Sequence, residues 1–230
     1  YDSENKTRRE LALISLAMAS ALKLTPAVLG ILLLYNKQWK EAIRTVIYGL
    51  ILGMVPFLFF HGGLVNIGRM FHNAALNVQA YSSTEGTTIV AALVAFGVNA
   101  TDGMIKIVKC ITYVIVLLLF IQCLFYKEKW EVIMAVSMVL IIAPSHSGYY
   151  CIMYLIPAAI AFLNAKEHSY SDLLILFSII LIVMDFQCDL FEYVLNYHLA
   201  IMLILAVLLI RGFVRMYDVI KHKSDNSMAK

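Results

Sequence analysis

Long apolar segments, separated by short charged stretches, limit what this chain can fold into more than any other feature. Residues 42–60 and 107–126 each contain a single charged side chain, and about 20 such residues are enough to cross the hydrocarbon of a bilayer as an α-helix. Of the 230 residues, 62% are hydrophobic and only 14% are charged. So few charges cannot cover a water-soluble surface, which excludes a soluble enzyme, a nucleic-acid-binding domain and a disordered chain. We therefore predict an all-α, polytopic transmembrane helical bundle.

Seven further apolar runs complete the set, and several of them are too short to cross the hydrocarbon upright. The basic residues orient them. These runs cover residues 11–24, 26–35, 87–98, 132–143, 149–163, 173–184 and 196–212. Lysine and arginine accumulate in the cytoplasmic loops of membrane proteins. Fourteen of the 18 basic residues are cytoplasmic if that side holds residues 6–9, 37–44, 127–129, 166 and 211–230. The exceptions are Lys23, Arg69, Lys106 and Lys109.

This orientation requires two helical hairpins. The chain must enter and leave by the same face between residues 9 and 37, and again between residues 129 and 166. We expect the apices at residues 23–26 and 144–148, where a proline removes a backbone donor and favours a break in the helix. Residues 87–98 must then stay on the outer side, as a re-entrant or interfacial helix.

The non-cytoplasmic face is expected to gather the polar loops, which are residues 61–86, 100–109, 144–148 and 185–193. Within the first of these, residues 64–81 alternate apolar and polar side chains at helical spacing, which predicts an amphipathic interfacial helix. Non-helical backbone persists at membrane depth only where protein or a water-filled cavity satisfies it, so we expect a cavity open to the outside. We treat residues 1–215 as one transmembrane domain and residues 216–230 as a basic cytoplasmic tail.

Charged residues on this outer face are the candidates for chemistry. Lys23 is the strongest, because it interrupts about 25 otherwise apolar residues, where an ammonium group must be paired or hydrated. It predicts an anion site such as a phosphate site, although a lysine that reaches the interface from a hairpin tip gives the same pattern. The other candidates are Arg69, Lys106, Lys109 and His146 for binding phosphate, and Glu85 and Asp102 for acid–base catalysis. Each of these alone is also typical of a solvated loop, and no histidine or cysteine spacing predicts a metal site.

Three stretches of the sequence are more distinctive than the apolar runs and the charged residues. Residues 21–27 (ALKLTPA) are followed by a leucine run and a basic-Trp-basic turn at residues 37–40. Residues 56–63 (PFLFFHGG) end an apolar segment on proline, aromatic residues and glycine. Residues 143–158 combine a Pro-Ser-His-Ser break with a later Leu-Ile-Pro-Ala. Together, over roughly residues 9–215, the chain resembles the C-terminal half of the family 87 glycosyltransferases.

This resemblance implies a GT-C-type integral membrane enzyme. Such an enzyme takes a hexose, such as mannose, from a polyprenyl-phosphate sugar and transfers it to a glycan or lipid acceptor on the non-cytoplasmic face. The implied partners are membrane lipid and the lipid-linked sugar, without nucleic acid and without a cofactor, in the plasma membrane of a bacterium with the C-terminus in the cytoplasm. In the third stretch the family's tryptophan and paired histidines have no counterpart, because Ser147, Tyr149 and Tyr150 stand there, so their roles do not carry over. The family's catalytic acidic residue lies upstream of the matching region, so this chain would be a C-terminal part.

The resemblance assigns roles to the candidates. Lys23 would stabilise the charge that develops on the leaving phosphate, with Arg69, Lys106 and Lys109 as secondary cations. Glu85 or Asp102 would deprotonate the acceptor hydroxyl. Two alternatives stay open at this point. The paired broken helices and the cation also fit a secondary transporter or flippase for an anionic solute or lipid-linked substrate, and a non-catalytic polytopic subunit fits the composition alone.

Overall fold

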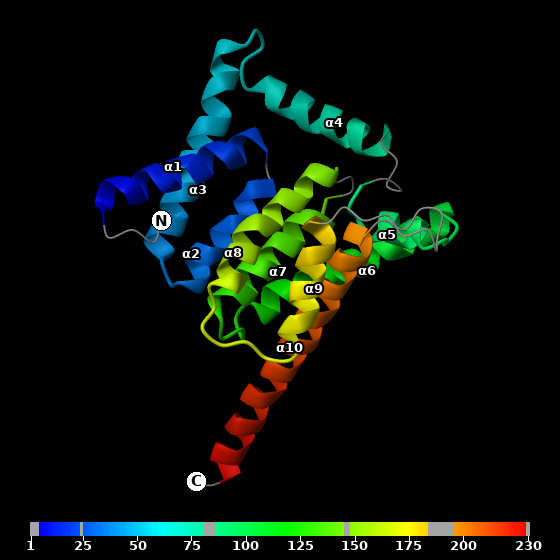
Figure 1. Ribbon diagram of the computed structural model, residues 1–230. Helices are drawn as coiled ribbons and strands as arrows, with labels where there is room; N and C mark the ends of the chain where they lie inside the picture. Colours follow the sequence, from blue (N-terminus) through cyan, green and yellow to red (C-terminus); the bar gives the residue numbers. More distant parts are fainter. Residues whose placement is uncertain (1–4, 24, 81–85, 145–147, 184–195, 229–230) are drawn as a thin grey trace. The chain divides into compact units, whose positions relative to one another are not determined.

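The computed structural model describes residues 5–23, 25–80, 86–144, 148–183 and 196–228, and the elements in these ranges are helices (Figure 1). The chain divides into two compact units, Tyr1–Tyr81 and Ser82–Lys230. Unit 1 contains α1 (Lys6–Leu22), η1 (Thr25–Gly30), α2 (Ile31–Tyr35), α3 (Trp39–Met54), η2 (Val55–Phe59) and α4 (Val65–Ala80). Unit 2 contains α5 (Ile89–Ala95), α6 (Asp102–Gln122), α7 (Lys129–Ile142), η3 (Tyr149–Tyr154), α8 (Leu155–Leu163), α9 (Asp172–Val183) and α10 (Asn196–Met228). The predicted all-α class is confirmed.

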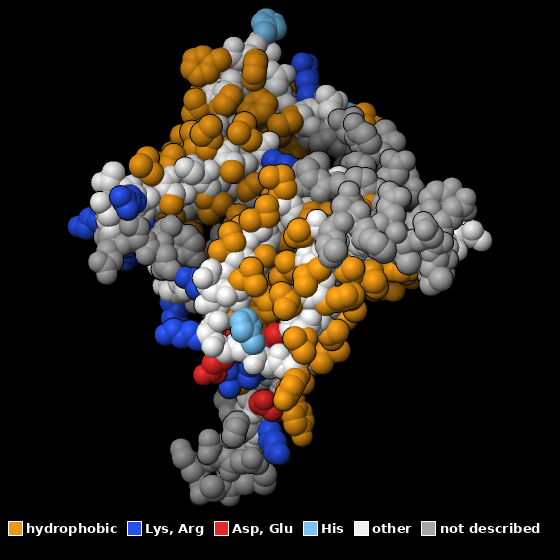
Figure 2. All heavy atoms as spheres, viewed as in Figure 1, with side chains coloured by type: hydrophobic (Ala, Val, Ile, Leu, Met, Phe, Trp, Pro, Cys, Tyr) orange, Lys and Arg blue, Asp and Glu red, His pale blue; other side chains and the backbone are white. Residues whose placement is uncertain are grey.

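Three helices in the described part of the chain are long and apolar enough to cross a membrane, namely Trp39–Phe59, Asp102–Gln122 and Asn196–Lys221. The first two match the predicted full spans. The third is longer than the predicted run at 196–212, because no proline follows that run and the helix continues to Met228. Hydrophobic side chains cover much of the visible surface (Figure 2), as lipid contact requires. α5 has only seven residues and, at about 10 Å, is too short to cross.

Unit 1 breaks where the sequence predicts its hairpin. α1 ends at Leu22, and its C-cap residue Lys23 donates its backbone N–H to the carbonyl of Ala19. The next helix, η1, begins at Thr25 and has Pro26 at its second position. Proline has no N–H to continue the hydrogen bonds of α1, so the helix stops before it.

Two ion pairs show that the chain returns to its starting level before α3. Arg9 Nη2 on α1 lies 3.9 Å from Glu41 Oε1 on α3, and Arg44 Nη2 lies 2.5 Å from Glu10 Oε2. The start of α3 therefore lies beside the start of α1. This is the arrangement expected if η1 and α2 lead back to the face at which α1 entered.

Small residues allow α1 and α3 to approach closely. A Cβ added to Gly49 would lie 3.8 Å from the carbonyl oxygen of Ala17, and one added to Gly53 would lie 3.8 Å from the Cβ of Ala21. Small residues four positions apart are a common contact between membrane helices. Because residue numbers rise together along both helices, α1 and α3 run in the same direction.

α7 is the buried centre of unit 2. Twelve of its 14 residues are buried, and it contacts α6, η3, α8 and α10. At the start of α7, Trp130 meets Phe162 from the end of α8, with ring centroids 5.0 Å apart. α8 therefore leads back along α7, as the second predicted hairpin requires. Part of the predicted apex, residues 145–147, lies outside the described ranges.

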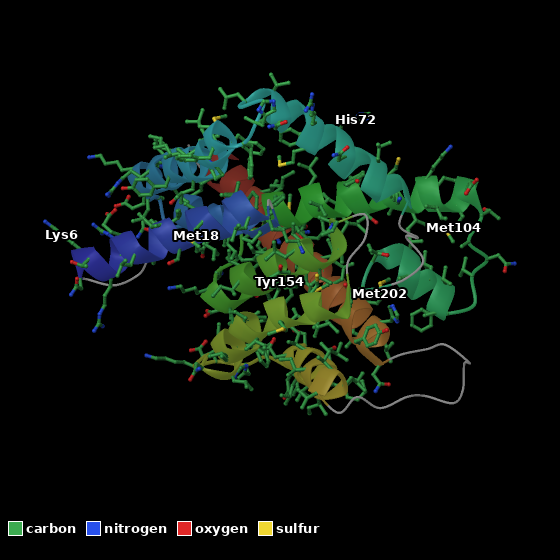
Figure 3. All side chains as sticks on the ribbon, turned by 90° about the horizontal axis from the view of Figure 1, so that it is seen from above. Lys6, Met18, His72, Met104, Tyr154 and Met202 are labelled. Carbon is green, nitrogen blue, oxygen red and sulfur yellow. The ribbon has the colours of Figure 1, made fainter. Side chains whose placement is uncertain are left out.

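The helices of unit 2 meet at two ends, one at each end of α7. We define the polar end as residues 86–90, 102–113, 142–144 and 196–198, and the basic end as residues 122–131, 162–172 and 208–212. At the polar end, the cap of α5 and residues 109–113 of α6 lie near the end of α7, and the start of α10 meets the turn before α5. Figure 3 views the structure from above, with Met104 on the first turn of α6 and Met202 near the start of α10. Two of the predicted outer loops meet at this end, because Lys109 of residues 100–109 lies beside Pro144 of residues 144–148.

Candidate functional site

A small cavity at the polar end contains one of the predicted phosphate-binding residues. Its volume is about 20 Å³, space for one water molecule. It is lined by Thr88, Ile89, Val90, Lys109, Thr112, Tyr113, Ile142, Ala143 and Pro144. Lys109 is partly buried there. The structure thus brings the predicted loop residues Lys109 and Pro144 to one place, next to the cap of α5.

Three predicted site residues share one face of α6. The helix begins at its N-cap Thr101, whose hydroxyl accepts a hydrogen bond from the backbone N–H of Met104 at 3.3 Å. Asp102, Lys106 and Lys109 follow at intervals of four and three residues, which places them along one face. Asp102 and Lys106 are exposed, whereas Lys109 reaches the cavity. One rigid helix therefore presents a carboxylate and two ammonium groups together, a combination suited to acid–base work beside an anion.

A buried histidine at the polar end was not predicted. His198, near the start of α10, is 3% exposed. Its Nε2 lies 3.0 Å from the carbonyl oxygen of Gly86, and because a carbonyl only accepts, Nε2 carries the proton. This hydrogen bond holds the start of α10 against the turn that precedes α5. In the sequence, His198 could have been noticed as a single histidine within the apolar run 196–212.

The remaining predicted residues lie elsewhere. Lys23 is exposed at the junction between α1 and η1. Arg69 is exposed on α4 and donates from Nη1 to Asn66 Oδ1 at 3.4 Å. Both belong to unit 1, whereas the candidates on α6 belong to unit 2. Glu85 and His146 lie outside the described residues. Within the described ranges, no group of three or more His, Cys, Asp or Glu side chains is arranged to hold a metal ion.

The sequence over residues 4–145, more than half of the chain, matches the profile of glycosyltransferase family 87. The chain belongs to glycosyltransferase family 87. The match contains the first two resembling stretches, at 21–40 and 56–63, and ends just inside the third at 143–158. No curated protein and no solved structure gives a significant match. With three apolar helices long enough to span a bilayer, this family 87 chain is an integral membrane glycosyltransferase.

A buried ionic network at the basic end of the family 87 chain was missed by the sequence reasoning. Arg211 Nη1 lies 3.2 Å from Glu131 Oε1, and its Nη2 lies 2.6 Å from Asp172 Oδ1. The side chains of Glu131 and Asp172 are 1% and 5% exposed. Asp172 also accepts the backbone N–H of Ser169 at 2.7 Å, and His168 Nδ1 lies 3.5 Å from the same carboxylate. The network joins α7, α9 and α10.

Neutral hydrogen bonds reinforce the same junction. Tyr126 donates to the carbonyl of Leu208 at 3.0 Å, and Gln122 Nε2 donates to the carbonyl of Leu209 at 3.2 Å. Tyr126 lies just beyond the end of α6, and because a carbonyl only accepts, its phenol is the donor in this bond. These contacts lie a full α7 length from Lys109, so the network holds helices together rather than taking part in chemistry at the polar end.

Proposed function

We propose that the chain transfers a hexosyl group, such as mannosyl, from a polyprenyl-phosphate sugar to a glycan or lipid acceptor on the non-cytoplasmic side of the membrane, as a GT-C-type enzyme. The family match over residues 4–145 supports the reaction class. The observation that carries the donor assignment is the partly buried Lys109 beside the end of α7. We place the enzyme in the plasma membrane of a bacterium, in cell-envelope synthesis, with its C-terminus in the cytoplasm.

In the proposed reaction, an acceptor hydroxyl oxygen attacks the anomeric carbon of the donor sugar. The bond between that carbon and the phosphate oxygen breaks, and its electron pair leaves with the polyprenyl phosphate. The hydroxyl proton passes to a carboxylate, for which Asp102 and Glu85 are the candidates. Cations beside the phosphate stabilise the negative charge that develops on it. We assign that role to Lys109 and Lys106, with Lys23, Arg69 and His146 as further candidates.

Lys109 comes first among the cations because of its surroundings. Lys106 is exposed to solvent, whereas Lys109 is partly buried among Thr112, Tyr113 and apolar residues. A charge in less polar surroundings interacts more strongly with a nearby phosphate than a hydrated one does. The hydroxyl group of the neighbouring Tyr113 is a further donor for phosphate oxygens, whereas the hydroxyl of Thr112 donates to the carbonyl of Val108 at 2.8 Å.

The test measures sugar transfer from polyprenyl-phosphate mannose by the purified full-length protein that contains this chain. Lys109→Ala should lower kcat by about 10²–10³-fold, the loss typical of one group that stabilises transition-state charge. Lys106→Ala should cost less, and Lys221→Ala, which removes an exposed lysine near the far end of α10, should leave turnover unchanged. Unfolding midpoints of the three variants separate lost activity from lost folding. Equal turnover of the Lys109→Ala and Lys221→Ala variants would remove the phosphate role of Lys109.

Transport of an anionic or lipid-linked solute is less well supported, because the family match favours transfer chemistry. The two functions differ in product. Counterflow of a labelled solute in proteoliposomes, without any covalent sugar product, would support transport and contradict the proposed function.

A further inference from the structure

A large hollow lies at the basic end of unit 2, away from the polar-end residues. Its volume is about 530 Å³, within the roughly 300–1,000 Å³ of small-molecule sites. It lies between the start of α7 and the end of α8, and we name it the basic-end hollow. Its lining residues are Glu128, Lys129, Trp130, Ala161, Asn164, Ala165, Lys166 and Glu167. The proposed transfer reaction uses none of these residues.

Both walls of the basic-end hollow carry both signs of charge. The α7 side supplies Glu128 and Lys129, and the loop after α8 supplies Lys166 and Glu167. Two positive and two negative groups give a formal sum of zero. A ligand with one net charge gains nothing from such a lining, whereas a zwitterion can place each of its charges beside an opposite one.

The inner wall is fixed and contains a donor without a partner. Trp130 is 3% exposed, with the Arg211 guanidinium 5.1 Å from its ring centroid and Phe162 packed edge-on against it. Among the described residues, the indole Nε1 of Trp130 has no hydrogen-bond acceptor. Because this nitrogen is buried, Trp130 forms a rigid wall of the hollow rather than a contact for the ligand.

An apolar stripe on α8 leads to the hollow. Ile156, Ile160 and Leu163 are 53%, 56% and 60% exposed, and their spacing of four and three residues puts them on one face of the helix. Leu163 is followed directly by Asn164, which lines the hollow. A ligand with a charged head and an apolar tail can therefore place its head in the hollow and its tail along α8.

We propose that the basic-end hollow binds the headgroup of a phospholipid that carries a primary ammonium group, such as phosphatidylethanolamine. The phosphate lies beside Lys129 and Lys166, and the ammonium group lies beside Glu128 and Glu167. A primary ammonium donates hydrogen bonds to carboxylates, which a choline group cannot do. Choline prefers an open aromatic face, but Arg211 already covers a face of Trp130.

Lipid binding to the full chain in detergent tests the proposal. Phosphatidylethanolamine, phosphatidylcholine and phosphatidylglycerol with identical acyl chains are titrated, and binding is followed by native mass spectrometry and by the shift in unfolding temperature. The soluble headgroup glycerophosphoethanolamine is titrated in parallel. We expect phosphatidylethanolamine to bind about tenfold or more tightly than the other two lipids, the effect of one charge-assisted hydrogen bond.

Two substitutions in an exposed loop test the contact with the phosphate and the contact with the ammonium group separately. Lys166→Ala should weaken binding of phosphatidylethanolamine and phosphatidylcholine alike, because both carry the phosphate. Glu167→Gln should reduce the preference between them without weakening the phosphate contact, because one of the two carboxylates beside the ammonium group is lost. Lys221→Ala serves as the matched control and should change neither. Replacement of either loop residue leaves the helix caps and the ionic network intact, so folding is retained.

Three results would overturn the proposal. Equal affinity for the three lipids would exclude headgroup recognition, and an unchanged preference in the Glu167→Gln variant would exclude the ammonium contact. Binding of free glycerophosphoethanolamine as tight as that of the lipid would show a site for a soluble zwitterion rather than for a membrane lipid.

Discussion

Replacement of Arg211 by methionine is expected to destabilise unit 2 strongly. The guanidinium donates a hydrogen bond to Glu131 and forms an ion pair with Asp172. The two carboxylate side chains are 1% and 5% exposed, and the arginine side chain is 16% exposed. Arg211→Met therefore leaves two buried carboxylates without their cation. The loss of one partner from a buried ion pair typically costs about 3–5 kcal/mol, and we expect a loss of this size here. Lysine at this position should recover only part of it, because an ammonium lacks the planar fork that reaches both carboxylates.

The free energy of unfolding of the purified chain, from a denaturing-detergent titration followed by circular dichroism, measures this loss. The triple variant Arg211→Met, Glu131→Gln, Asp172→Asn should be more stable than Arg211→Met alone, because no buried charge is then left unpaired. Arg215→Met, one turn further along α10, is the matched control and should change stability by less than about 0.5 kcal/mol. If Arg211→Met costs no more than Arg215→Met, the network does not hold the three helices together.

Three further predictions concern single contacts, each measured as a change in the free energy of unfolding. Gly53→Leu should cost about 1–3 kcal/mol, because its side chain enters the close contact with Ala21 on α1; a neutral result would contradict that contact. Gly212→Val should cost a similar amount, since even a Cβ there overlaps the Gln122 side chain, and an unchanged midpoint would show that this glycine is not required. His198→Phe should cost about 1–3 kcal/mol, because a buried carbonyl before α5 loses its donor; equal stability would show that the bond is not needed.

The sequence predicts much of the topology because its signals are local. Pro26 stops α1 through its own chemistry, and a count of basic residues per loop places both hairpins without knowledge of any contact. The ion pair of Arg9 with Glu41 and the packing of Trp130 on Phe162 then agree with those two reversals. α10 is longer than predicted because a helix ends at a stop signal, and none follows the apolar run.

The ionic network could not be predicted in the same way. Arg211 interrupts an apolar run as Lys23 does, but the basic residues after it make it look like the start of a tail. Its partners Glu131 and Asp172 lie 80 and 39 positions away along the chain (211 − 131 and 211 − 172). Only the packing of three helices brings them together. The bond between His198 and Gly86 is hidden for the same reason, since neither residue indicates the other.

α6 and α7 lie side by side with unequal lengths. α6 has 21 residues and α7 has 14, so at 1.5 Å per residue α7 stops about 10 Å short of the first turn of α6. Lys109 lies seven residues into α6, level with this step and beside the last residues of α7. This difference of about 10 Å is a third of the roughly 30 Å hydrocarbon layer, and the cap of α5 packs beside it around the small cavity. In the proposed reaction, this position would let Lys109 meet the phosphate of a polyprenyl donor within the thickness of the membrane, without lifting it into the water.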